Sequence, residues 1–303
     1  MDIRKYQGVI PAFYACYDDM GEVSPERTRA LARHLLEKGV KGLYVGGSSG
    51  ECIYQSVAER KVVLENVMAE VGGKLTVIAH VACNNTADSQ ELAKHAEGLG
   101  VDAVAAIPPI YFHLPPYGIA EYWNDISTAA PNTDFIIYNI PQLAGVALTP
   151  ALLAEMRKNP RVIGVKNSSM PTQDIQMWKD QGGADFVVMN GPDEQFISGL
   201  AMGATGGIGG TYAVMPELFF KARELFYDGK PTEAFAVQNE VCRIIYKMCE
   251  AHGNLYAVMK AILAKHGVEC GGVRKPLPAL GVGDMAIVDA ADAMISTAIS
   301  RYC

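Results

Sequence analysis

One pattern recurs along most of the chain, from Gly8 to about Tyr212. An amphipathic segment is followed by a glycine-containing turn and then by four to six apolar or β-branched residues, and this unit occurs eight times. Such alternation is typical of a parallel β-sheet whose strands are joined by crossover helices. The predicted strands are Val9–Tyr14, Gly42–Val45, Leu75–Val81, Ala103–Ile107, Asp134–Tyr138, Val162–Lys166, Phe186–Met189 and Gly206–Ile208.

The number and spacing of these units predict a closed (β/α)8 TIM barrel, an α/β fold, over residues 1–225. Eight units in about 210 residues match that barrel better than an open, doubly wound parallel sheet, which is the alternative. Periodicity does not reveal closure, and the glycine-rich last unit has weak strand character. The helices are expected to begin at N-cap residues, namely Ser24, Ser56, Asn85 or Thr86, and Thr149.

Beyond Met215 the pattern changes, and the remaining segments are predicted to be helical. No linker rich in Ser and Gly divides the chain into independent parts. We therefore expect residues 226–303 to form a C-terminal helical extension that packs on the barrel. The predicted helices of this part of the chain are Pro216–Tyr227, Thr232–Ala251, Leu255–His266 and Asp284–Arg301.

The composition favours a soluble globular protein with a small-molecule ligand. Half of the residues are apolar, 19% are charged, and no run is long and apolar enough to cross a bilayer. The 26 Lys and Arg residues are dispersed in a chain of net charge −7, which argues against nucleic-acid binding. The seven cysteines lack metal-ligand spacing, so no metal site is expected. The first residues lack the apolar core of a secretory signal, and we expect a cytoplasmic location.

A single lysine stands at the carboxyl end of the sixth predicted strand, in Arg161-Val-Ile-Gly-Val-Lys-Asn-Ser168. Burial disfavours an ammonium group and lowers its pKa, and a neutral lysine amine can attack a ketone to form an imine. Lys166 is therefore a candidate nucleophile. By itself it also fits a lysine whose stem packs on the protein while its head reaches water.

The turn after the second predicted strand, Gly46-Gly-Ser-Ser-Gly-Glu51, is a candidate anion site. In a TIM barrel the carboxyl ends of all strands meet at one mouth, so this turn would face Lys166. Free N–H groups and the hydroxyls of Ser48 and Ser49 can bind an anion, and the absence of a lysine favours a carboxylate over a polyphosphate. An ordinary surface loop is the other interpretation.

Two further strand ends add polar groups to the same mouth. Tyr138, in Tyr138-Asn-Ile-Pro141, ends the fifth predicted strand and can pass a proton, or it can cap the core with its hydroxyl in water. Asp193 and Glu194 follow the seventh strand and would place two carboxylates at the rim. They can accept hydrogen bonds from a polyhydroxylated ligand, although exposed acidic turn residues need no such role.

Together these groups predict imine chemistry on an α-keto acid. The carboxylate would bind at Ser48 and Ser49, Lys166 would condense with the ketone, and Tyr138 would move a proton. The iminium group would withdraw electrons from the carbon–carbon bond beyond it. This chemistry needs no metal or organic cofactor.

Three motifs, Gly46–Glu51, Tyr138–Pro141 and Gly164–Ser168, resemble signatures of the N-acetylneuraminate lyase and dihydrodipicolinate synthase superfamily of pyruvate-dependent class I aldolases. The resemblance covers essentially the whole chain, including the helical tail. It implies a TIM barrel, an imine-forming Lys166, a proton-relaying Tyr138, a pyruvate-carboxylate site at Ser48 and Ser49, and a homotetramer. Tyr111 matches a family tyrosine that reaches a neighbouring subunit's site, although core or interface packing explains it equally well.

Within this superfamily the sequence is closer to the lyases. Synthases carry an arginine after the Tyr-Asn-x-Pro motif, where this chain has Gln142-Leu-Ala-Gly145, and a neutral residue cannot pair bidentately with a carboxylate. The segment Asn190-Gly-Pro-Asp-Glu194 is similar to the sialic-acid lyase pattern. That similarity implies a substrate site at Gly191, Asp193 and Glu194, with the two carboxylates on the sugar's glycerol-like tail.

Ser168 lies two residues after the lysine, as a hydroxyl does in those lyases. Two positions depart from the lyase pattern. Gly210 stands where many lyases have a serine that contacts the sugar, and Ser168-Ser-Met-Pro171 is not the commonest continuation.

The expected function is cleavage of N-acetylneuraminate, or a similar 2-keto sugar acid, to pyruvate and an aldehyde sugar. The alternative is a 4-hydroxy-tetrahydrodipicolinate (dihydrodipicolinate) synthase or another pyruvate-dependent aldolase or dehydratase. A third hypothesis is a barrel that binds a keto acid without turnover. A phosphosugar aldolase is disfavoured because Gly206–Gly210 contains no Lys or Arg.

Overall fold

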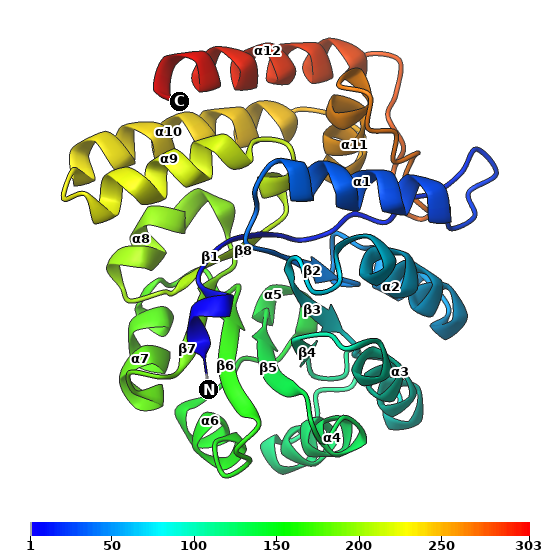
Figure 1. Ribbon diagram of the computed structural model, residues 1–303, viewed down its shortest axis with the longest axis vertical. Helices are drawn as coiled ribbons and strands as arrows, with labels where there is room; N and C mark the ends of the chain where they lie inside the picture. The colour runs from blue at the N-terminus through cyan, green and yellow to red at the C-terminus, as the bar shows by residue number, and fades with distance from the viewer. Residues whose placement is uncertain (1) are drawn as a thin grey trace.

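A computed structural model describes residues 2–303 of the chain. Eight parallel strands form one sheet in the order β1-β8-β7-β6-β5-β4-β3-β2. The sheet closes where Ala12, just after β1, bridges Tyr44 of β2, and the Phe13 N–H donates to the Tyr44 carbonyl at 2.9 Å. The structure is therefore the predicted (β/α)8 barrel, and the open sheet is wrong (Figure 1).

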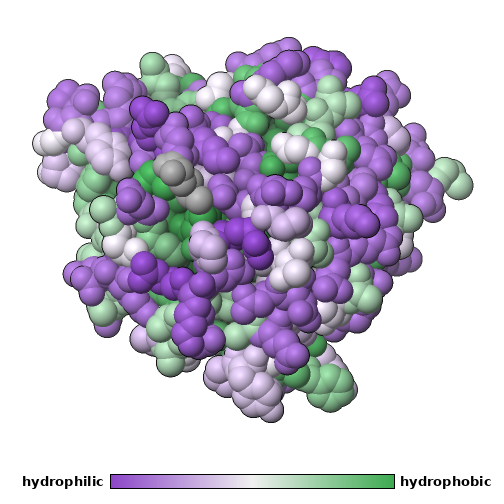
Figure 2. Space-filling view, turned by 60° about the horizontal axis from the view of Figure 1, so that its bottom comes forward, coloured by the Kyte–Doolittle hydropathy of each residue, from purple (hydrophilic) through white to green (hydrophobic). Residues whose placement is uncertain are grey.

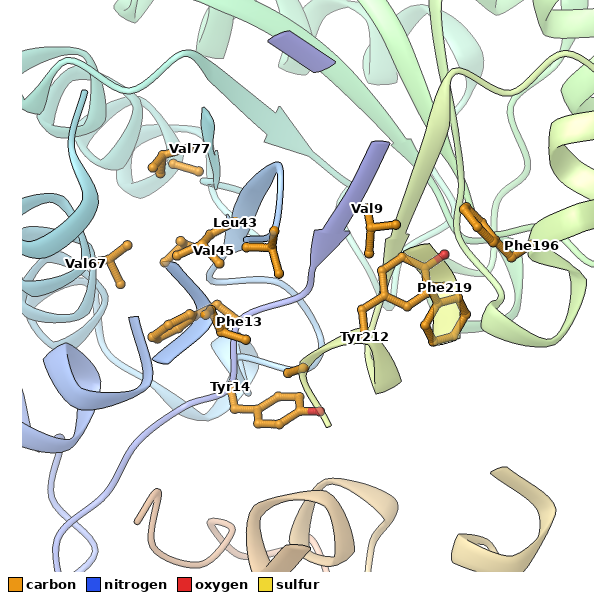
Figure 3. Close-up of a cluster of buried hydrophobic side chains, with 14 of the residues drawn as sticks. Val9, Phe13, Tyr14, Leu43, Val45, Val67, Val77, Phe196, Tyr212 and Phe219 are labelled. Carbon is orange, nitrogen blue, oxygen red and sulfur yellow. The ribbon is translucent and has the colours of Figure 1, made fainter. Parts of the chain in front are cut away.

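The strands are β1 (Gly8–Pro11), β2 (Gly42–Val45), β3 (Thr76–His80), β4 (Ala103–Ala106), β5 (Asp134–Asn139), β6 (Val162–Asn167), β7 (Val187–Asn190) and β8 (Gly206–Gly209). All eight lie where the periodicity predicts them, with bounds that shift by at most one residue except at β1. There the predicted strand runs to Tyr14 and is too long. Regular pairing ends at Pro11, and Phe13 and Tyr14 turn into the layer between barrel and helices (Figure 3).

The helices around the barrel are α1 (Pro25–Glu37), α2 (Val57–Val71), α3 (Thr86–Leu99), α4 (Pro116–Ala129), α5 (Pro141–Ala144), α6 (Pro150–Met156), α7 (Gln173–Gly182), α8 (Phe196–Ala201) and α9 (Pro216–Tyr227). The predicted N-caps are confirmed, because each side chain accepts a backbone N–H at its helix start. At α3 the cap is Asn85 and not Thr86.

Three more helices follow: α10 (Pro231–Met248), α11 (Leu255–Lys265) and α12 (Asp284–Tyr302). In the described chain no strand follows β8. Figure 1 shows α9, α10 and α12 stacked on one side of the barrel, with α11 beside them. The boundary expected after residue 225 falls in the last turn of α9, so a separate unit over 226–303 stays a prediction.

The strands separate two apolar clusters. Ile10, Ile78 and Ile208 belong to the cluster that fills the barrel, whereas Val9 and Val77 belong to the layer between strands and helices. This alternation is expected because successive side chains of a strand point to opposite faces. Figure 3 shows part of the outer layer. The barrel interior is thus a packed apolar medium into which the site residues project.

The outer surface is different in character. The face in Figure 2 is mostly hydrophilic, with scattered hydrophobic areas. Among the described helices, none is both long and apolar enough to span a membrane.

Candidate active site

Lys166 points into the barrel from the penultimate position of β6. Strand pairing places it between Tyr138 of β5 and Met189 of β7, and paired residues of neighbouring strands face the same side of the sheet. The lysine is 4% exposed, so the interpretation in which its head reaches water is wrong. Its Nζ lies 3.7 Å from the centroid of the Tyr138 ring and 4.3 Å from that of Tyr44.

The surroundings of Lys166 favour a neutral amine. Burial lowers its pKa from 10.5 to about 7, and the charges of Asp193 and Cys52 oppose that shift. Among residues 2–303 no carboxylate pairs with its Nζ, and no group hydrogen-bonds to it. A substantial fraction of Lys166 is therefore unprotonated at neutral pH, which is the form that attacks a ketone.

Tyr138 is a buried phenol directly beside this amine. Burial raises its pKa to about 12, while hydrogen bonding with the hydroxyls of Ser48 and Ser168 opposes the rise. Its ring packs edge-on against Tyr44 and His80, with centroids 5.6 Å and 5.8 Å away. Aromatic side chains from β2 and β3 therefore fix the phenol as a neutral group between the amine and two hydroxyls.

The turn between β2 and α2 forms a cradle of unused donors. Gly46 has a φ of +75°, and a Cβ on Gly47 would lie 2.7 Å from the Tyr44 ring, so this path requires glycine. Ser49 is 5% exposed. In the described chain, the backbone N–H groups of Ser48 and Ser49 donate to no acceptor. Free N–H groups so close to Tyr138, with the hydroxyls of Ser48 and Ser49 beside them, suit a carboxylate.

Glu51 anchors this turn from behind. It is a non-glycine residue in the left-handed region, with a φ of 51°, and it is 1% exposed. Its carboxylate accepts from Lys260 Nζ at 2.7 Å and from the Arg274 N–H at 2.8 Å. Lys260 lies on α11 and also donates to the Gly272 carbonyl at 2.7 Å. The helical extension therefore holds the Gly46–Glu51 turn.

Asp193 and Glu194 differ from the prediction, which placed both carboxylates at the rim. Only Glu194 is exposed, whereas Asp193 is 7% exposed and its Oδ2 accepts from the N–H and hydroxyl of Thr211 at 2.7 and 2.6 Å. The reason is the 3-10 helix Asp193–Gln195, in which successive side chains point about 120° apart. Burial raises the pKa of Asp193 to about 7, and the Thr211 hydrogen bonds oppose this shift.

Two glycines leave room for hydroxyls of the site. A Cβ on Gly191 would lie 2.0 Å from Ser168 Oγ, so that glycine makes space for the Ser168 hydroxyl. A Cβ on Gly210 would lie 3.3 Å from Ser49 Oγ, which places the departure from the lyase pattern beside the anion-binding turn.

The segment after Tyr138 supplies no positive charge. Gln142 lies in the segment where synthases are expected to carry an arginine. Its Nε2 donates to the Ser168 carbonyl at 2.7 Å. Its amide therefore supports the site backbone and cannot offer a charged pair to a second carboxylate.

Tyr111 lies apart from the other predicted site residues. It is 85% exposed, has a φ of 82°, and its ring lies edge-on to that of Phe112, with centroids 4.9 Å apart. Core packing is therefore wrong for this tyrosine. It lines an open cavity of about 490 Å³ with Asn84 and Asp125, and none of the other predicted site residues lines that cavity.

Sequence reasoning missed His80, Glu51 and Lys260 as parts of this site. One signal was present for Lys260, which stands among apolar residues in Val258-Met-Lys-Ala-Ile-Leu263. His80 ends β3, and its Nδ1 forms a hydrogen bond with the Gly46 carbonyl at 2.8 Å. Its ring is neutral because burial and a nearby arginine lower its pKa to about 3.

Comparison with known proteins places the chain in a family. The model of the dihydrodipicolinate synthetase family matches residues 5–284. N-acetylneuraminate lyase of Mediterraneibacter gnavus is 67% identical over 302 residues, which span 99% of this chain and 96% of the relative. A catalytic lysine mutant of Ruminococcus gnavus sialic acid aldolase is 66% identical, with a TM-score of 0.99, covering 100% of this chain and 99% of that one.

A more distant structure shows how far the fold is shared. A DHDPS from Cyanidioschyzon merolae with lysine bound has a TM-score of 0.90 at 25% identity and covers 96% of this chain and 98% of that one. The backbone alone thus does not separate lyases from synthases, and the 67% identity to a lyase carries the distinction. The resemblance inferred from the three motifs is confirmed, and the chain belongs to the dihydrodipicolinate synthetase family.

Proposed function

We propose that the protein is a Schiff-base-forming carbon–carbon lyase that cleaves N-acetylneuraminate, or a similar 2-keto sugar acid, to pyruvate and an aldehyde sugar. The observation that carries this proposal is the buried amine of Lys166, without an ion pair in the described chain and 3.7 Å from the ring centroid of Tyr138. The 67% identity to a lyase over nearly the whole chain supports the same reaction.

In the first step the substrate carboxylate binds to the free backbone N–H groups of Ser48 and Ser49 and to their hydroxyls. The neutral amine of Lys166 then attacks the ketone carbon, and the resulting carbinolamine loses water to give an iminium ion. Because burial already lowers the pKa of Lys166 to about 7, no strong base is needed to deprotonate it.

In the second step the carbon–carbon bond beyond the iminium breaks. The adjacent hydroxyl loses its proton and becomes the aldehyde, while the bonding electrons move to the iminium nitrogen and give an enamine. The enamine takes up a proton at carbon, and water then releases pyruvate from Lys166. Tyr138 relays the protons, and its raised pKa keeps the phenol protonated at rest, so that it gives up one proton and then takes another back.

The remaining site residues bind the sugar. The exposed Glu194 accepts hydroxyl protons of the tail, and Ser168 offers a hydroxyl in the room left by Gly191. Asp193 lies deeper, where its carboxylate acts on the charge of Lys166 as well as on the ligand. These roles are proposals that rest on position and burial.

A homotetramer with Tyr111 reaching a neighbouring subunit's site also belongs to the proposal. An aromatic surface suited to an interface is present at Tyr111, Phe112 and Tyr117, which are 85%, 73% and 77% exposed. If Tyr111 acts across the interface, mixing inactive Lys166→Ala and Tyr111→Ala chains under subunit exchange will restore part of the activity. Mixtures that stay inactive would count against it.

The cytoplasmic location stays a prediction.

A coupled assay separates the lyase from the synthase. We expect pyruvate release from N-acetylneuraminate and no turnover of pyruvate with aspartate semialdehyde, because Gln142 cannot pair with the second carboxylate. Turnover of the latter pair alone would overturn the lyase assignment. If a sugar acid raised the melting temperature and no substrate in a panel gave product, a binding protein without turnover would be the better conclusion.

A further inference from the structure

Arg60 is a buried cation for which the reaction above has no role. It lies near the start of α2 and is 7% exposed. Its Nη2 donates to the His80 carbonyl at 2.7 Å, and its Nη1 donates to the Ala82 carbonyl at 2.8 Å and to Cys83 Sγ at 3.2 Å. Burial raises the pKa of Cys83, so all three acceptors are uncharged.

No anion of the described chain balances this charge. None of the ion pairs among residues 2–303 includes Arg60. An arginine is seldom buried without a counter-charge, because removing an ion from water is costly. Its charge also reaches the site, since it contributes to the lowered pKa of His80 and opposes the rise in the pKa of Tyr44.

The guanidinium stands directly behind the anion-binding turn. A Cβ on Gly46 would lie 3.9 Å from Arg60 Nη2. The turn and the arginine are also linked through β3, because Arg60 holds the His80 carbonyl and the His80 ring holds the Gly46 carbonyl. A carbonyl only accepts, so the neutral ring carries its proton on Nδ1. The cation and the turn therefore form one connected unit.

We propose that Arg60 is a positioning residue whose charge balances the substrate carboxylate held at Ser48 and Ser49. The free N–H and hydroxyl groups of the turn supply the hydrogen bonds, and Arg60 supplies the missing positive charge from behind without touching the ligand. This inference rests on the proposed function, because it needs a keto acid seated at the turn. A single buried charge also matches a monocarboxylate better than a polyphosphate.

Two substitutions separate charge from hydrogen bonding. Arg60→Gln keeps hydrogen-bond donors and removes the charge, whereas Arg60→Lys keeps the charge and loses part of the donor set. The readout is the rate of inactivation by borohydride as a function of ketone concentration, at about pH 8.5, where Lys166 is neutral. The two probes are pyruvate and pyruvamide, in which a neutral amide replaces the carboxylate.

For Arg60→Gln we expect the half-saturating pyruvate concentration to rise about tenfold or more, with the saturated rate within about threefold of wild type. For pyruvamide the half-saturating concentration should stay within about threefold, because that ligand has no charge to balance. Arg60→Lys should bind pyruvate nearly as well as wild type only at a pH low enough for its buried amine to stay protonated, because burial lowers the pKa of a lysine. A purely structural role would weaken both ligands together.

The inference is overturned if Arg60→Gln binds pyruvate like wild type, or if Arg60→Gln weakens pyruvate and pyruvamide equally. Should Arg60→Gln fail to fold, Arg60→Met replaces it, since an apolar residue removes the buried charge and its donors together. If neither folds, Arg60 serves the fold and the inference is withdrawn. Absence of trapping in the wild type with any keto acid would instead reject the proposed function.

Discussion

Two lysines are buried in this protein, and their surroundings differ in one decisive respect. Lys260 lies on α11 and is 1% exposed, and its Nζ forms an ion pair with the Glu51 carboxylate at 2.7 Å. Lys166, 4% exposed inside the barrel, meets aromatic rings and forms no ion pair in the described chain. Burial alone therefore does not make a lysine reactive. A fixed partner carboxylate holds one amine as a structural cation, and the lack of one leaves the other free to lose its proton.

The largest expected effect separates these lysines directly. Lys166→Ala should abolish lyase activity and imine formation, because it removes the buried amine beside Tyr138. Lys260→Met should still form the imine at saturating pyruvate, since Lys260 holds the turn and does not attack the ketone. Steady-state pyruvate release and borohydride trapping check both variants. Loss of trapping in a folded Lys260→Met protein would mean that the two roles are not distinct.

Tyr138→Phe tests the second member of the reactive pair. We expect imine formation to persist while turnover falls by about 10² to 10⁴, because the phenol moves protons and is not the attacking group. Comparing trapping with the rate of pyruvate release in one preparation measures this split. Equal loss of both would show that Tyr138 and Lys166 are misassigned.

The structural lysine is tested by stability. Removing one partner of the buried Glu51–Lys260 pair should cost about 3 to 5 kcal/mol of unfolding free energy, because the other charge stays buried and unpaired. Denaturant unfolding of Lys260→Met and of the double variant Glu51→Gln/Lys260→Met measures it. The double variant should be the more stable of the two. Single and double variants with unchanged stability would contradict a tight structural pair.

A smaller effect concerns pH. Activity should rise with pH through about 7, as Lys166 loses its proton. The Asp193 carboxylate raises the pKa of Lys166, so Asp193→Asn should move the acid limb of the profile to lower pH. The pH dependence of trapping at saturating pyruvate measures this shift free of binding effects. A shift to higher pH would mean that the sign of the coupling is wrong.

The fold and the centre of the site were predictable from local signals. Strand periodicity placed Lys166 and Tyr138 at strand ends, and the parallel pairing of β5 with β6 brought them together. Asp193 was misplaced because the 3-10 turn that buries it leaves no periodic signal in three residues. The contact between Glu51 and Lys260 joins residues 209 positions apart, a separation at which a single sequence carries no pairing information.

The most direct test of the account is to locate the imine. The protein is incubated with pyruvate and sodium borohydride, digested, and examined by mass spectrometry. The account predicts one reduced pyruvate adduct, on the peptide that contains Lys166, and none at Lys260. An adduct at another lysine, or none under conditions that label a known class I aldolase, would contradict it.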